Sequence, residues 1–241
     1  IHFTCQAKYS SFIIHRLSFI INNLSMKLLL IGMGPGNGIS IAKRFGREGF
    51  EILMVARNED KLKSYVAELA QSGIKSQAYP ADIADSDTFV RLLEHIVDEH
   101  KDIEILHYNA SSYNPATPSQ ISLSVFLNDL NINVVGALLA AKAVFSQMKE
   151  REHGAMFFTG GGTAYQAPAM LASLGMGKAA MRNLVFSIAQ EGAPLGIKAA
   201  TVTISGMVKA GTRFDPDLIA DEFWRLYQLP KGQWETEVHW Q

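Results

Sequence analysis

The chain has 241 residues, of which 48% are hydrophobic and 19% are charged, and its single cysteine is Cys5. These values exclude a disordered polyampholyte, an intramolecular disulfide and a zinc site built on several thiolates. The net charge is −1, which gives no indication of a nucleic-acid partner or an anionic membrane surface. Because no uninterrupted apolar run approaches the roughly 18 residues of a membrane span, we expect a cytoplasmic protein with no membrane partner.

Residues 1–25 differ from the rest, since they contain two basic residues and four serines but no Asp or Glu. Three interpretations stay open. A secretory signal fits poorly because His15-Arg16 splits the apolar stretch, whereas a mitochondrial presequence fits the composition better and would imply a mitochondrial location. We favour the third, in which the native start is Met26 and the upstream residues come from a start assigned too early or from an expression vector. The expected domain is 26–241.

Short apolar runs of strand length alternate with longer stretches of helical spacing from Lys27 onward. The runs are Lys27–Gly32, Glu51–Ala56, Ser76–Pro80, Ile103–Tyr108, Ala155–Thr159 and Ile197–Ile204. Repeated strand–helix alternation predicts an α/β fold of the Rossmann type. We expect a single domain with a doubly wound parallel sheet, three layers and right-handed crossovers.

A glycine-rich turn follows the first predicted strand, in the order Gly32-Met-Gly-Pro-Gly36-Asn-Gly38, and a helical pattern begins directly after it. A helix N-terminus offers unpaired N–H groups and the positive end of the helix dipole. Glycines let the backbone approach a diphosphate without Cβ atoms in the way. Gly32, Gly36 and Gly38 are therefore candidate dinucleotide contacts; the alternative is a tight turn that packs the helix against the strand.

The second predicted strand ends at Val55-Ala56-Arg57. An Asp or Glu at this strand end would accept hydrogen bonds from the ribose 2′-hydroxyl and favour NAD. Ala56 and Arg57 stand there instead, and a guanidinium suits a 2′-phosphate. The sequence thus favours NADP over NAD, unless Arg57 is a solvated loop charge.

In combination, these residues resemble the short-chain dehydrogenase/reductase family from Lys27 to about Gly206. Asp82-Ile83 resembles the pair that meets the adenine ring, and Tyr108-Asn109-Ala110-Ser111 resembles the Asn-Asn-Ala-Gly motif. Asn133 is similar to the family's structural asparagine and Lys178 to the lysine that binds the cofactor ribose. Ser205-Gly206-Met-Val208 resembles the turn whose backbone, near Val208, holds the nicotinamide carboxamide.

The resemblance implies an NAD(P)-dependent oxidoreductase that acts on a small carbonyl or alcohol. It also implies a homodimer or homotetramer, formed through the helical stretches Ser124–Lys149 and Ala172–Glu191. The tail from Ile219 resembles a divergent bacterial branch in which the active site is often incomplete.

The chain departs from the family pattern at the two proton-handling positions. The family uses a tyrosine four residues before the lysine and a serine thirteen residues before that tyrosine; here the two positions are Leu174 and Gly161. Neither side chain can donate a proton, and the loss of a general acid typically costs about 10²-fold to 10⁴-fold in rate. Tyr165 is a speculative substitute donor, with a packing tyrosine at the pocket rim as the alternative.

We therefore expect an NADP(H)-binding oxidoreductase of this family with an atypical active site. The candidate catalytic residues are Lys178, Asn133 and Tyr165, and no metal site is expected because the histidines show no ligand spacing. The alternative is a non-catalytic NADP-binding sensor or a subunit of a larger assembly.

Overall fold

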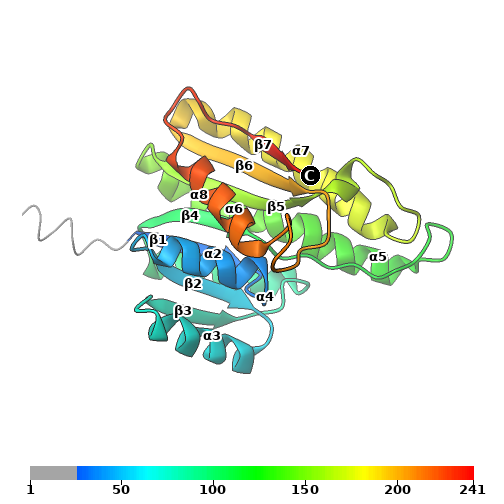
Figure 1. The fold of residues 1–241 in the computed structure, drawn as a ribbon, viewed down its shortest axis with the longest axis horizontal. Coiled ribbons are helices and arrows are strands. Elements are labelled where there is room, and N and C mark those ends of the chain that lie inside the picture. Colours follow the sequence, from blue (N-terminus) through cyan, green and yellow to red (C-terminus); the bar gives the residue numbers. More distant parts are fainter. Residues whose placement is uncertain (1–25) are drawn as a thin grey trace, which may run out of the picture.

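The protein was analysed as a computed structural model that describes residues 26–241 (Figure 1). The expectations about residues 1–25 lie outside the described residues. Within them, seven strands form one parallel sheet in the order β3-β2-β1-β4-β5-β6-β7. The strands are β1 (Lys27–Ile31), β2 (Glu51–Ala56), β3 (Ser76–Pro80), β4 (Ile103–Tyr108), β5 (Gly154–Gly161), β6 (Ile197–Ile204) and β7 (Glu237–Trp240).

Helices cover both faces of the sheet. They are α2 (Asn37–Gly46), α3 (Glu59–Gln71), α4 (Ser86–Glu99), α5 (Leu123–Leu130), α6 (Gly136–Glu150), α7 (Ala172–Gly192) and α8 (Pro216–Gln228). A π-helical turn, η1 (Asn131–Val135), joins α5 to α6, and single 3₁₀ turns lie at η2 (Gly162–Ala164) and η3 (Ala193–Leu195). The core on one face takes its helical residues from α4, α6 and α7, and the core on the other face from α2, α3 and α8.

Strand β5 shows how the sheet separates the two cores. Successive strand residues point to opposite faces. Phe157 packs against Phe223 of α8, with ring centroids 5.8 Å apart, while its neighbour Phe158 lies on the other face near Tyr108, 6.4 Å between centroids. Because both faces are covered, the central strands are continuous apolar runs. The predicted three-layer, doubly wound single domain is confirmed.

The run Leu123–Glu150, from α5 to α6, is long and apolar enough to cross a membrane by length and composition alone. Helices that pack on a sheet pass the same test, and α6 packs on β4 and α4. The π-helical turn interrupts the run, and Asp129 within it is fully buried among hydrogen-bond donors. Packing accounts for the buried part of this run, whereas Leu123, Leu127 and Leu138 within it remain exposed.

The functional edge of the sheet is set by the strand order. From β1 the chain first builds β2 and β3 on one side, then crosses to β4 on the other. The loops after β1 and β4 consequently diverge and leave a crevice between them, which is where open parallel sheets bind their ligands.

Candidate functional site

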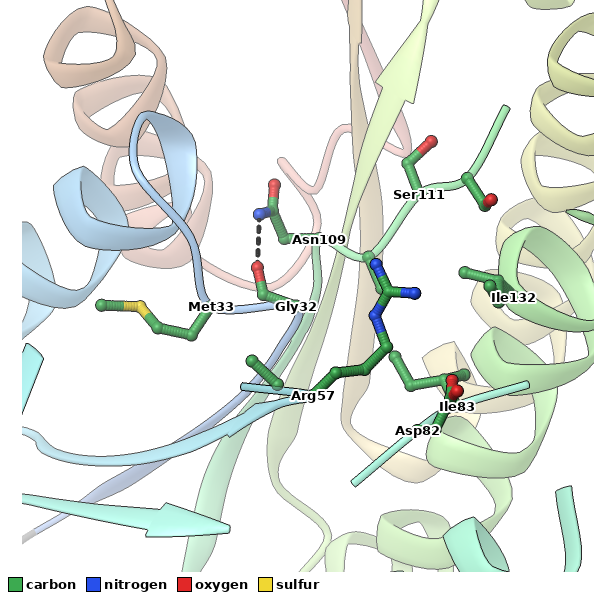
Figure 2. Close-up of a pocket in the computed structure, with 11 residues that line it drawn as sticks. Gly32, Met33, Arg57, Asp82, Ile83, Asn109, Ser111 and Ile132 are labelled. Carbon is green, nitrogen blue, oxygen red and sulfur yellow. Dashed lines mark hydrogen bonds between the residues drawn. The ribbon is translucent and has the colours of Figure 1, made fainter. Parts of the chain in front are cut away.

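A pocket of about 280 Å³ opens at the carboxyl ends of the central strands (Figure 2). The residues that line it come from the strand-end loops and from η1: Gly32, Met33, Ala56, Arg57, Asp82, Ile83, Asn109, Ala110, Ser111, Ser112 and Ile132. Five predicted cofactor contacts, Gly32, Arg57, Asp82, Ile83 and Asn109, are thus brought together. Gly36, Gly38, Asn133, Tyr165, Lys178 and Val208 are not among the lining residues.

The glycine turn uses its glycines in different ways. A Cβ on Gly32 would lie 2.4 Å from the backbone nitrogen of Ala110, so this position must be bare for the turn to pack on the loop after β4. A Cβ on Gly38 would lie 3.3 Å from the Gly32 carbonyl. Gly36, with φ of 111°, adopts a conformation that side-chain-bearing residues rarely take, and space beside it is open.

Gly36 is the N-cap residue of helix α2, and no side chain in the described range caps this helix. Within the same range, helices α6 and α7 also begin without a side-chain cap, whereas side-chain oxygens of Asn58, Asp85, Ser122 and Asp215 cap α3, α4, α5 and α8. The uncapped N–H groups of α2 and the open space at Gly36 make a cradle suited to a phosphate group.

Arg57 follows β2 and is exposed. Figure 2 shows its side chain extending into the pocket, and within residues 26–241 no carboxylate pairs with its guanidinium. An unpaired guanidinium directed into a pocket is suited to bind an anion, preferably a phosphate that accepts two hydrogen bonds.

Asp82 and Ile83 line the pocket wall after β3. The Asp82 carboxylate is exposed and accepts a hydrogen bond from the backbone N–H of Ala84 at 3.0 Å, while Ile83 is buried. The pair therefore offers one polar group and one apolar surface to whatever occupies this end of the pocket.

Asn109 joins the glycine turn to the loop after β4. Its Nδ2 donates to the Gly32 carbonyl at 2.9 Å (Figure 2). Its Oδ1 accepts from the Thr159 hydroxyl at 2.8 Å. Thr159 also contacts His107, 3.1 Å from its Nε2. The sequence singled out Asn109 and Gly32, whereas the buried Thr159 and His107 carry no motif that would have marked them.

Lys178 lies on α7 with only 7% of its surface exposed, and its Nζ donates to the Thr159 carbonyl at 2.7 Å. Burial lowers the pKa of Lys178 to about 8. The ammonium and the neutral amine are therefore both accessible near neutral pH, unlike those of an exposed lysine.

Asn133 lies in the π-helical turn η1 and binds the backbone of Ser112 twice. Its Oδ1 accepts from the Ser112 N–H at 2.9 Å, and its Nδ2 donates to the Ser112 carbonyl at 2.7 Å. A Cβ on Gly177 of α7 would lie 2.7 Å from the Asn133 Cβ, so the two helices touch here. In this structure Asn133 anchors the loop that forms the pocket wall.

Asp129, one helical turn before Asn133, is a site-adjacent residue that sequence reasoning missed. This fully buried carboxylate accepts hydrogen bonds from the Ser112 hydroxyl at 2.8 Å, the Ser173 hydroxyl at 2.6 Å, and the backbone and side-chain nitrogens of Asn114. It ties the pocket loop to α7 directly before Leu174. Its only sequence signal is an acidic residue within an apolar helical run.

Gly161 and Leu174 both neighbour Lys178. Gly161 ends β5 in an extended conformation (φ −155°, ψ 143°), and a Cβ there would lie 3.5 Å from the Lys178 Cγ, an ordinary van der Waals distance. Leu174 lies four residues before Lys178 on α7, so both side chains share one helix face. The positions given by the family resemblance thus converge on the buried lysine, although neither residue can transfer a proton.

Tyr165 is 52% exposed, and its hydroxyl donates to Glu237 Oε2 of β7 at 2.8 Å. The Arg182 guanidinium lies 4.9 Å from its ring centroid and pairs with the same carboxylate. Partial burial, together with Glu237, raises the pKa of Tyr165 above its usual value. Val208 is 36% exposed, in the loop after β6.

Comparisons with known proteins identify the family of the chain and agree with its fold. The short chain dehydrogenase family model matches residues 27–218, and the chain belongs to the short-chain dehydrogenase/reductase family. Members of this family are oxidoreductases that bind NAD(P), act on small molecules and typically form oligomers.

The chain is 26% identical over 201 residues to dehydrogenase/reductase SDR family member 4 of Sus scrofa, covering 83% of this chain and 71% of that protein. It is 26% identical over 207 residues to 2,3-dihydro-2,3-dihydroxybenzoate dehydrogenase of Bacillus subtilis, covering 86% and 78%. A relative from Streptomyces coelicolor matches over 147 residues, which is 56% of that protein's length.

Solved structures share the fold. A short-chain dehydrogenase from Rhodopseudomonas palustris superposes with a TM-score of 0.80 at 25% identity, covering 89% of this chain and 97% of that one. A metagenomic short-chain oxidoreductase in complex with NADP gives a TM-score of 0.82 at 19% identity, covering 89% and 96%.

Proposed function

We propose that this chain is an NADP(H)-binding oxidoreductase with an atypical proton-transfer site, which transfers hydride to or from a small carbonyl or alcohol. The observation that carries the proposal is the Arg57 guanidinium, which pairs with no carboxylate of residues 26–241 and extends into the same pocket that the glycine turn borders. No acidic residue stands at the end of β2 to prefer a ribose 2′-hydroxyl, because Ala56 occupies that place.

The chain's own residues fit a dinucleotide. The uncapped N-terminus of α2 and Gly36 would receive the diphosphate, Arg57 the 2′-phosphate, and Asp82 and Ile83 the adenine end. Lys178 would bind the nicotinamide ribose as an ammonium, and the backbone near Val208 the carboxamide. When bound, the nicotinamide supplies the hydride; the protein supplies orientation and charge.

The reaction also needs a group that donates or accepts a proton. Leu174 and Gly161 have none to give, and Tyr165 offers its hydroxyl to Glu237. We propose that the proton comes from water beside Lys178 or from the substrate itself. The same two residues favour the second candidate function, a non-catalytic NADP-binding sensor or assembly subunit.

A reduction assay separates the two functions. Purified protein is incubated with NADPH and a panel of small aldehydes, ketones and quinones, and NADPH oxidation is followed by absorbance. Turnover above the uncatalysed rate supports the oxidoreductase. Saturable NADPH binding without turnover on any substrate supports the sensor or subunit.

We expect Tyr165→Phe to leave turnover unchanged within about twofold, because the contacts place this hydroxyl in a surface network with Glu237 and Arg182. The measurement is kcat on the best substrate of the panel, with thermal stability as the control for folding. A loss of about 100-fold or more with an unchanged melting temperature would identify Tyr165 as the substitute proton donor.

The affinity for NADPH should depend on pH through Lys178. Its pKa is lowered to about 8, so the ammonium that would bind the ribose is lost as the pH rises through that value, while Arg57 stays charged. We expect NADPH to bind up to about tenfold more weakly at about pH 10 than at about pH 7. The Lys178→Met variant should bind NADPH weakly at both pH values. A change in its NADPH affinity with pH as large as in the wild type would contradict the assignment of the pH dependence to Lys178.

We also propose a homodimer or homotetramer formed through α5, α6 and α7. Large apolar side chains are exposed on these helices, at Leu123 (71%), Leu127 (49%), Leu138 (42%) and Phe186 (38%). Their burial between copies would remove apolar surface from water. Light scattering tests this directly, and a monomer at micromolar concentration would contradict it.

A further inference from the structure

Thr159 connects three residues at the floor of the site. It lies on β5, two residues before Gly161, and only 8% of its surface is exposed. Its hydroxyl lies within hydrogen-bond distance of Asn109 Oδ1 and His107 Nε2, and its carbonyl accepts from Lys178 Nζ. One residue therefore contacts both Asn109, which lines the pocket, and the buried Lys178.

The direction of these hydrogen bonds follows from counting protons. The Gly32 carbonyl can only accept, so the Asn109 amide must direct its Nδ2 toward Gly32 and its Oδ1 toward Thr159. The Thr159 hydroxyl donates its single proton to that Oδ1. It can then only accept from His107, whose Nε2 must carry the proton.

The surroundings of His107 fit the same assignment. The side chain is fully buried and packs edge-on against Phe223, with ring centroids 4.3 Å apart, beside Phe157. Its Nδ1 has no hydrogen-bond partner among the described residues, so it can remain a bare acceptor but not a second donor. Burial lowers the pKa of His107 to about 3, which keeps the imidazole neutral.

We propose that His107 and Thr159 are positioning residues: a chain of donors from His107 through Thr159 to Asn109 fixes the Asn109 amide and holds the glycine turn at Gly32. This inference rests on the proposed function for its purpose, since the turn and Asn109 would meet the dinucleotide. A chain in which every hydrogen bond runs in the same direction suits this role, because each donor fixes the orientation of the group that accepts from it. The loop after β4 is thereby locked to the loop after β1.

The first test needs no cofactor. Nitrogen-15 NMR of the wild-type imidazoles should show His107 as the neutral tautomer with the proton on Nε2, unchanged between about pH 5 and about pH 8. In Thr159→Val the acceptor is gone, and the His107 Nε2 signal should shift while Thr159→Ser keeps the wild-type value. A wild-type His107 that titrates near its ordinary pKa, or carries its proton on Nδ1, overturns the proposal.

The second test is NADPH affinity in matched pairs. Thr159→Val should bind about tenfold more weakly because Asn109 loses its donor, and Thr159→Ser should stay within about twofold of wild type. His107→Leu should weaken binding, and His107→Gln, which keeps an N–H near the Nε2 position, should restore it. The change of NADPH affinity with pH that we assign to Lys178 should persist in Thr159→Val, because the backbone carbonyl of residue 159 that accepts from the Lys178 ammonium remains.

The two proposals fail in different ways. Wild-type affinity in a folded Thr159→Val variant overturns the positioning role and leaves the proposed function intact. A wild type that binds neither NADPH nor NADH overturns the proposed function, while the tautomer measured on the same sample still decides whether the donor chain exists.

Discussion

Replacing Leu174 by tyrosine and Gly161 by serine together should raise the rate of NADPH-dependent carbonyl reduction by about 10²-fold to 10⁴-fold. Position 174 shares a helix face with Lys178, whose ammonium would lower the pKa of a phenol placed one turn away. Position 161 is extended, and an added Cβ there meets Lys178 at an ordinary contact distance, so the backbone and the Cβ of a serine fit at this position.

Two control variants isolate the added hydroxyl groups. Leu174→Phe with Gly161→Ser keeps the aromatic ring but lacks the phenol, and Leu174→Tyr with Gly161→Ala lacks the serine hydroxyl. The first should show no gain, and the second an intermediate one. A restored double variant that folds and binds NADPH but gains no activity contradicts the assignment of positions 161 and 174 as the proton-handling pair.

Arg57→Ala should weaken NADPH binding by about 10-fold to 100-fold and change NADH affinity by less than about threefold. A hydrogen bond to a charged group contributes about 1.5–3 kcal/mol, and only NADPH carries the 2′-phosphate that Arg57 would bind. The measurement is the dissociation constant of each dinucleotide by fluorescence titration. The quantity to compare between variants is the ratio of the NADPH and NADH dissociation constants.

Lys61→Ala is the matched control for charge. Lys61 lies on α3, exposed, in the first turn after the Asn58 cap, and does not line the pocket. Removal of the Lys61 charge should change the affinities for NADPH and NADH slightly and equally, through long-range electrostatics alone. Equal losses for NADPH and NADH in Arg57→Ala would show that Arg57 acts through net charge alone and would remove the basis for preferring NADP.

Most strands that the sequence patterns predicted are buried on both faces; the exception is β3, a partly buried edge strand that was also predicted. β1 and β4 are continuous apolar runs because helices cover each side of the sheet, and such runs are visible in the sequence. β7 escaped prediction. It is a short edge strand, Glu-Val-His-Trp, only partly covered, and its pairing with β6 depends on contacts distant in sequence.

The site was predictable where a residue acts through its type and its place at a strand end, as with Gly32, Arg57 and Asn109. Residues that act through partners were not. Thr159 and His107 are ordinary strand residues until the sheet brings β4 and β5 together in register. The hydrogen bonds of Asn133 with Ser112 also depend on how the loop after β4 folds back onto the π-helical turn.

The central claim is that the glycine turn and Arg57 hold a dinucleotide carrying a 2′-phosphate. Parallel calorimetric titrations of NADPH and NADH into the wild-type protein test it most directly. The account predicts one NADPH per chain, bound at least about tenfold more tightly than NADH. Binding of neither dinucleotide, or a preference for NADH, would contradict it.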